Sequence, residues 1–166
     1  MRFSPTRRVA LLAVDSTLGQ DIDFANARPA TGMTLNLEAV IQPTDHLALD
    51  IIQNMRSLHV EAPAADDDQL FVQRVSRLKG TYTFTSRLFV RAIAQYVATT
   101  RDPSLYTFRV TRRSGDFAGS VLFAYKLNWQ SVIFVGYGDD RALTLAGDLA
   151  PVDRQFFAKL SYAFQR

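Results

Sequence analysis

Hydrophobic and polar side chains alternate along most of the chain with a period of two residues, the period of a β-strand. Residues 87–98 show it most clearly, because one set of alternate positions is entirely apolar and the other set is mixed. The apolar set is Leu88, Val90, Ala92, Ala94, Tyr96 and Ala98, and the mixed set is Arg87, Phe89, Arg91, Ile93, Gln95 and Val97. The same alternation occurs in residues 33–41, 117–127 and 156–164, and no window holds a sustained helical stripe. The pattern therefore predicts an all-β chain.

The connections between the predicted strands differ in length. We expect short turns at residues 42–45, 85–86 and 128–131, and long polar loops near residues 23–30, 61–68, 99–116 and 139–153. Short turns on one side and long loops on the other are typical of barrels in the bacterial outer membrane. The sequence thus predicts an antiparallel up-and-down transmembrane β-barrel, of which about eight strands are visible.

Composition is compatible with this fold and excludes a helical membrane protein. The chain has 166 residues, of which 48% are hydrophobic and 21% charged, and its mean hydropathy is −0.03. No stretch approaches the roughly 18 unbroken apolar residues that a spanning helix needs. The length of unbroken apolar sequence does not exclude membrane β-strands, because only every second residue of such a strand faces lipid. We expect a single barrel domain over residues 1–166, or the C-terminal part of a larger barrel.

A resemblance between two segments supports the prediction that the chain is the C-terminal part of a larger barrel. Residues 2–11 and residues 40–49 both pair a strand end with a Pro-Thr turn and the start of a next strand. This match predicts that residues 1–3 are the tail of a strand whose body lies upstream. We therefore expect further barrel strands before Met1.

Alternation alone does not distinguish an apolar row that faces lipid from one that forms the core of a soluble barrel. The positions of the aromatic residues favour the lipid-facing interpretation. Large rings lie where strands meet short turns or the chain end, which is where a membrane-interface girdle forms. The candidate interface aromatics are Tyr82, Phe84, Tyr125, Trp129, Tyr162 and Phe164. The opposite row would then line a lumen, and its candidate polar residues are Gln73, Arg77, Lys79, Arg87, Arg91 and Gln95. Pairing of such lumen cations with Glu38 or Asp50 is the expected state.

Three segments carry a resemblance to a known family: residues 86–96, residues 123–138 and residues 159–164. They resemble the C-terminal barrel of an uncharacterised family of bacterial outer-membrane proteins that carry an N-terminal module similar to family-9 carbohydrate-binding domains. The resemblance implies an outer-membrane location, contact with outer-membrane lipid, and recognition by the barrel-insertion machinery through the last strand. That N-terminal module is absent here, so polysaccharide binding would come only through it. The resemblance supplies no catalytic residue.

Candidate chemistry is sparse. The absence of cysteine excludes disulfides and thiolate sites, and the net charge of +3 is scattered, which is weak evidence for nucleic acid. His46 and His59 should lie near opposite rims, and residues 137–140 resemble a polymerase metal motif without its helices. The acidic run at residues 66–68 is expected to be a solvated loop rather than a cation site.

The sequence therefore predicts a membrane anchor or conduit, not an enzyme, with no metal and no cofactor. The alternative is a soluble up-and-down β-barrel or sandwich that binds a small ligand in its interior.

Overall fold

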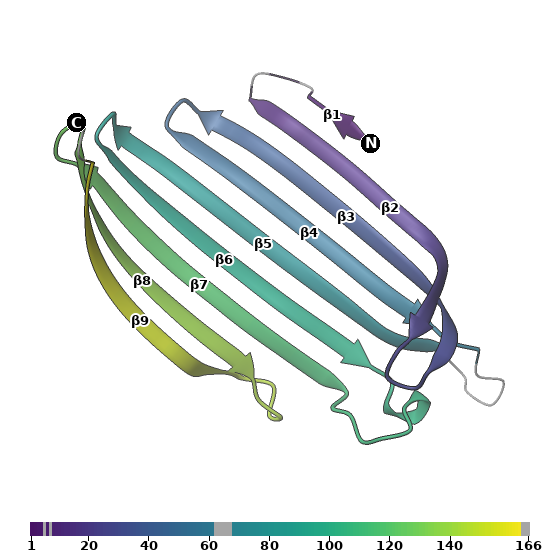
Figure 1. The fold of residues 1–166 in the computed structure, drawn as a ribbon. Coiled ribbons are helices and arrows are strands. Elements are labelled where there is room, and N and C mark those ends of the chain that lie inside the picture. Colours follow the sequence, from purple (N-terminus) through teal and green to yellow (C-terminus); the bar gives the residue numbers. More distant parts are fainter. Residues whose placement is uncertain (5, 7, 62–67, 164–166) are drawn as a thin grey trace.

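The computed structural model describes residues 1–4, 6, 8–61 and 68–163, and these form one curved antiparallel sheet (Figure 1). Its nine strands lie in chain order, so each pairs only with its neighbours in sequence. The strands are β1 Arg2–Phe3, β2 Val9–Asp23, β3 Arg28–Thr44, β4 Leu47–His59, β5 Gln69–Thr85, β6 Leu88–Arg101, β7 Arg113–Lys126, β8 Ser131–Leu143 and β9 Leu149–Tyr162. The all-β, up-and-down prediction is confirmed.

The sheet is open, with β1 and β9 as its two edges. The two-residue β1 pairs with β2 through Arg2 opposite Ala13 and Phe3 opposite Leu12, so the strand end predicted at residues 1–3 is present. One short 3-10 helix, Pro103–Leu105, interrupts the loop between β6 and β7. Over the described part of the chain, no helix has the length and apolar character needed to cross a membrane.

Two of the predicted long loops are wrong, because strands continue into them. Residues 24–27 alone join β2 to β3, and residues 144–148 join β8 to β9. The polar residues that suggested a loop at 23–30 instead build a tight turn around the Asp23 carboxylate, which is 2% exposed. This carboxylate accepts hydrogen bonds from the Ala25 amide at 3.1 Å, the Asn26 side chain at 2.7 Å and Arg28 Nε at 3.0 Å. The short turns predicted at the opposite end are present, but they are shifted by one or more residues, to 45–46, 86–87 and 127–130.

The register divides the side chains between two faces of the sheet, since directly paired residues point to the same side. From β4 to β7, one row of partners is Ile51, Leu78, Ala94 and Gly119. The adjacent row, one residue along, is Asp50, Lys79, Ile93 and Ser120. We call the side with Ile51 and Leu78 the apolar face and the side with Asp50 and Lys79 the polar face.

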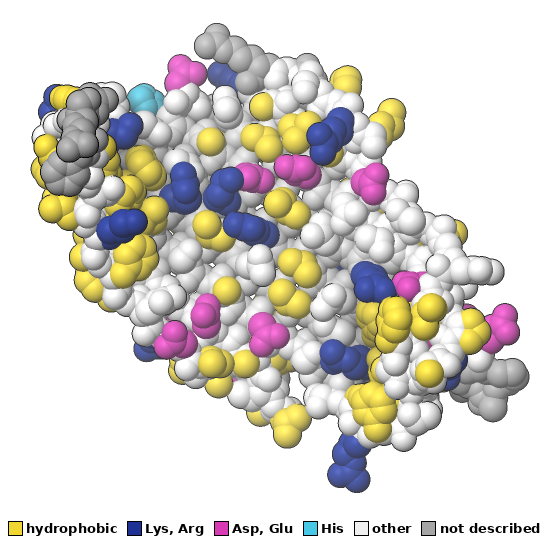
Figure 2. Space-filling view, viewed as in Figure 1, with side chains coloured by type: hydrophobic (Ala, Val, Ile, Leu, Met, Phe, Trp, Pro, Cys, Tyr) yellow, Lys and Arg dark blue, Asp and Glu magenta, His cyan; other side chains and the backbone are white. Residues whose placement is uncertain are grey.

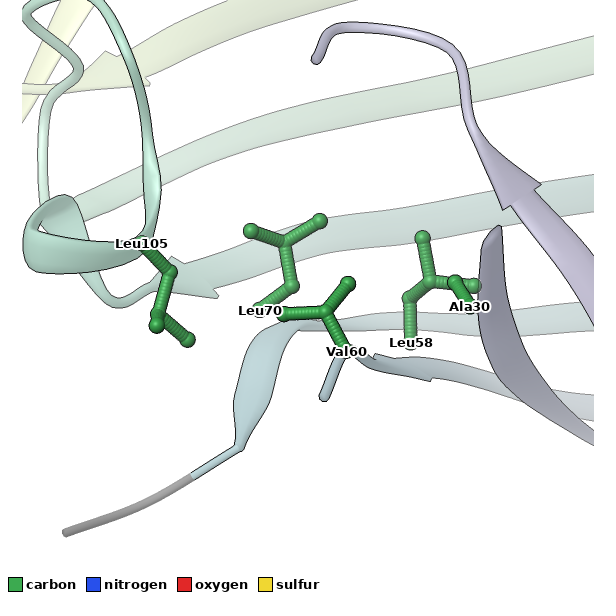
Figure 3. Packing of buried hydrophobic residues seen from close by; sticks show 5 residues of the cluster. All are labelled: Ala30, Leu58, Val60, Leu70 and Leu105. Atoms are coloured by element: carbon green, nitrogen blue, oxygen red, sulfur yellow. The ribbon is translucent and has the colours of Figure 1, made fainter. Parts of the chain in front are cut away.

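The best-buried hydrophobic cluster is small and lies at the long-loop end of the sheet. It consists of Ala30, Leu58, Val60, Leu70 and Leu105 (Figure 3). Leu105 comes from the β6–β7 loop, residues 102–112, and the other four come from β3, β4, β5 and the residue after β4. This cluster fixes the loop against the strands instead of forming a core beneath the whole sheet.

Candidate functional site

The apolar face is covered by nothing in the described chain, and its large side chains are exposed. They come from seven of the eight long strands: Leu12, Val14 and Leu18 of β2, Met33 and Leu37 of β3, Ile51 of β4, Leu78 and Tyr82 of β5, Val121, Phe123 and Tyr125 of β7, Tyr137 of β8, and Phe156, Leu160 and Tyr162 of β9. Their exposed fractions range from 37% to 73%. On β6 the exposed apolar residues of this face are the small Ala92 and Ala94. An apolar surface of this extent is unusual for a monomer in water and marks contact with protein or lipid.

The apolar residues form a band of limited height. On β7 it runs from Phe117 to Tyr125, nine residues, which matches the 9–11 residues that a tilted membrane strand needs. From β3 to β7 this band carries no charged side chain among the described residues, whereas on β8 Asp139 and Arg141 lie directly opposite the band residues Gly119 and Phe117 of β7.

Charged side chains of the same face lie toward the long loops, and on β8 and β9 they make the uncharged band shorter than it is on β7. Arg74 lies there on β5, Asp139 and Arg141 on β8, and Arg154 on β9. The Asp139 carboxylate accepts hydrogen bonds from Arg141 Nη2 at 2.6 Å and from Arg154 Nε at 3.2 Å. Asp140, the next residue, points to the polar face, so the two carboxylates of the polymerase-like motif lie on opposite sides of the sheet. The band therefore has a charged margin on the side of the long loops.

The predicted interface aromatics lie at the short-turn end of the sheet as far as they are described. The Tyr82 and Phe84 rings pack edge to face with centroids 4.7 Å apart, and Tyr125 is one residue before the end of β7. Trp129, 73% exposed, is in the β7–β8 turn, and the Tyr162 hydroxyl donates to Gln130 of that turn at 3.4 Å. The sixth candidate, Phe164, lies outside the described residues.

Five of the six predicted lumen residues lie on the polar face: Gln73, Arg77, Lys79, Arg91 and Gln95. The sixth, Arg87, is in the β5–β6 turn, because β6 begins one residue later than predicted, at Leu88. Figure 2 shows Lys and Arg side chains beside Asp and Glu side chains in the middle of the visible face. On the polar face, Lys79 Nζ and Asp50 Oδ2 form an ion pair at 2.5 Å.

The polar face keeps unused hydrogen-bonding capacity within the described chain. Asp50 Oδ1 and Arg91 Nε are buried atoms with no hydrogen-bond partner among the described residues. The Arg91 guanidinium also lies 5.7 Å from the centroid of the Phe89 ring, within cation–π range. Groups of this kind are costly in a dry core but acceptable on a surface that water reaches.

Sequence reasoning missed three aspartates that the register brings to the polar face. Asp140 of β8 is directly opposite Asp153 of β9, and Asp116 lies on neighbouring β7. All three were predicted to lie in the long loops 99–116 and 139–153, whereas the strands β7, β8 and β9 extend over them. Within the described residues no group of three His, Asp or Glu side chains is arranged to hold a metal ion. The acidic run at 66–68 is described only at Asp68, whose carboxylate lies 3.1 Å from His59 Nδ1; residues 66 and 67 are outside the described part.

Comparison with protein-family models, with curated proteins and with solved structures found no match to this chain. The function therefore has to be argued from the two faces of the sheet.

Proposed function

We propose that this chain is a membrane-embedded part of an outer-membrane β-barrel, which anchors or forms a conduit and has no chemistry of its own. In this proposal the apolar face contacts lipid and the polar face lines a water-filled lumen. The resemblance to the C-terminal barrel of the family with a carbohydrate-binding-like N-terminal module belongs to the same proposal. Entry into the membrane would use the last strand, β9, as the segment that the insertion machinery reads.

The observation that carries the proposal is the exposed, uncharged band of the apolar face. The nine-residue band on β7 has the length of a strand that crosses a bilayer core at a tilt, and on neighbouring β8 the uncharged band ends earlier, at Tyr137. The margin of the band at the short turns carries Tyr82, Tyr125 and Trp129. The margin toward the long loops carries Arg74 and the Asp139 ion pairs. Amphipathic rings and charges at the two margins are what the two membrane–water interfaces favour.

The opposite face supports the proposal by its composition. Arg77, Lys79 and Arg91 lie close to one another on β5 and β6, and Glu38 and Asp50 lie on the neighbouring strands of the same face. Side chains of this kind are stable only where water reaches them or where they pair. A water-filled lumen provides both conditions.

A barrel has a further requirement at the strand edges. In lipid every backbone N–H and C=O group needs a partner, so an open sheet edge is not stable there. The proposal thus requires that the outer edge of β9 be paired in the membrane, with the β1–β2 edge or with a strand outside the described residues.

The alternative of a soluble ligand-binding barrel or sandwich places the apolar face inside. It needs a second layer over that face or a sheet curled toward it. Among the described residues no element packs on the apolar face, while the β6–β7 loop contacts the polar one. No observation favours this alternative.

Fractionation tests the proposal. We expect the full chain, expressed with an export signal, to sediment with the outer membrane, to need detergent for extraction, and to migrate differently on a gel with and without heating. A soluble protein of known fold exported by the same signal is the control. Recovery of the chain as a folded monomer in plain buffer would refute the lipid-facing reading.

A further inference from the structure

The β6–β7 loop does not project away from the sheet but crosses the polar face toward β3. Its Leu105 side chain enters the buried cluster on the side of Leu70 (Figure 3), and the Leu105 carbonyl accepts a hydrogen bond from Arg28 Nη2 at 2.5 Å. Two residues further, the Thr107 amide and hydroxyl both donate to Asn26 Oδ1, at 3.0 and 2.9 Å. The loop is therefore held at both the cluster and the β2–β3 turn.

A pocket of about 570 Å³ lies between this loop and the strands. Its floor comes from the polar face and includes Gln73, Thr99 and Arg101. Its walls include Tyr106 and Phe108 of the loop, whose rings pack edge to face with centroids 5.7 Å apart. The volume is in the range of small-molecule sites, and the pocket combines an apolar wall with a few polar groups, as such sites do.

The charge inside the pocket is positive. Arg101 is its one charged lining residue in the described chain, and Nη1 of its guanidinium donates to the Ser114 hydroxyl at 3.0 Å. No carboxylate lines the pocket, and no ion pair involves Arg101 among the described residues. The guanidinium is thus oriented by Ser114 while its charge is not neutralised by an acidic side chain there.

The surroundings of the pocket have the same sign. Residues 101–113 hold four arginines and one acidic residue, Asp102. The Asp102 carboxylate is engaged by the amide and hydroxyl of Ser104, at 3.0 and 2.8 Å. Arg109, Arg112 and Arg113 are exposed. A cluster of exposed cations around a cleft raises the local concentration of anions.

The Tyr106 phenol adds a hydrogen-bond donor. Burial raises the pKa of Tyr106 above its ordinary value, the nearby Arg101 guanidinium only partly opposes this, and the Asp23 carboxylate adds to the rise. The phenol is therefore protonated at neutral pH and is able to donate to a bound anion.

We propose that this pocket binds a small organic anion, with its carboxylate on the Arg101 guanidinium and a ring-sized apolar body against Tyr106 and Phe108. Arginine suits this role because its planar fork matches a carboxylate with two parallel hydrogen bonds. Aromatic walls favour a flat body over a branched or fully hydrated one. The inference goes beyond a membrane anchor or conduit and does not depend on it, because the pocket lies in the loop end and not in the apolar band.

Calorimetric titration of the full chain with benzoate and with benzamide tests this. The two probes have nearly the same size and shape, but only benzoate is an anion at neutral pH. We expect saturable benzoate binding and at least tenfold weaker benzamide binding, with the chain in non-ionic detergent and its strand content verified by circular dichroism. Equal affinity for the two probes, or no saturable benzoate binding, would overturn the proposal.

Two variants locate the site. Arg101→Gln is expected to weaken benzoate binding at least tenfold, whereas Arg112→Gln, which removes the same charge from the adjoining loop outside the pocket, should change it less than twofold. Phe108→Ala should weaken both probes alike, because it removes wall area and no charge. Equal losses in the two arginine variants would show that the general positive field, and no defined site, attracts the anion. If Arg101→Gln fails to fold, Arg101→Lys takes its place in the comparison with Arg112→Gln. This variant keeps the positive charge and loses the planar fork.

Discussion

An arginine in place of Val121 is expected to lower the free energy of unfolding in lipid vesicles by about 2–4 kcal/mol. Val121 is at the centre of the β7 band between Phe117 and Tyr125, and its side chain is 47% exposed on the apolar face. In the proposed orientation this position lies near the bilayer midplane, where a guanidinium loses its hydration. Urea unfolding of the chain in vesicles measures the effect. Leu37→Arg, at the centre of the β3 band, should behave in the same way.

The matched control places the same charge on the other face of the same strand. Ala118 lies on the polar face, opposite Asp140 of β8 and Gln95 of β6. Ala118→Arg should change the free energy of unfolding by about 0.5 kcal/mol or less, since its guanidinium meets water and a carboxylate. If Ala118→Arg costs more than Val121→Arg, the two faces have been assigned the wrong way round.

Leu70→Ala is expected to cost about 2–5 kcal/mol, because it opens a cavity in the most buried cluster of the chain. Leu70 is 1% exposed and packs with Val60 and Leu105. Since Leu105 belongs to the β6–β7 loop, the substitution should also speed amide hydrogen exchange across residues 102–112. The first effect is measured by urea unfolding and the second by mass spectrometry of exchanged peptides.

Leu127→Ala is the control for this prediction. Leu127 follows β7 in a short turn and is 45% exposed, so its truncation should cost about 0.5 kcal/mol or less and leave the loop unchanged. Similar losses for the two leucines would mean that the cluster does not hold the loop.

The part of the fold that the sequence predicted is the part that local alternation encodes. Leu88 and Val90 were separated from Phe89 and Arg91 without knowledge of any partner strand, because successive side chains of a strand point to opposite sides. The turn at residues 86–87 was equally local. Its Thr85 hydroxyl accepts a hydrogen bond from the Leu88 amide at 3.2 Å, a contact within one turn.

What the sequence did not predict depends on partners far along the chain. No local pattern assigned a partner to Asp21, whose carboxylate on β2 accepts a hydrogen bond from Arg56 Nη2 of β4 at 2.8 Å. The β6–β7 loop was expected only as a long polar connection, because its anchors, Arg28 and Asn26, are 77 and 81 residues away from Leu105 and Thr107. Likewise, the anion pocket could not be predicted until the register placed Arg101 beneath Tyr106.

Contact between the apolar face and lipid is the central claim, and a cysteine scan of β6 tests it most directly. The chain has no cysteine, so each variant carries a single thiol for an environment-sensitive fluorophore. In vesicles with a quencher on the lipid tails, quenching should be strong at Val90, Ala92 and Ala94 and weak at Arg91, Ile93 and Gln95. Quenching that is uniform along these six positions, or strong at the second set, would contradict the claim.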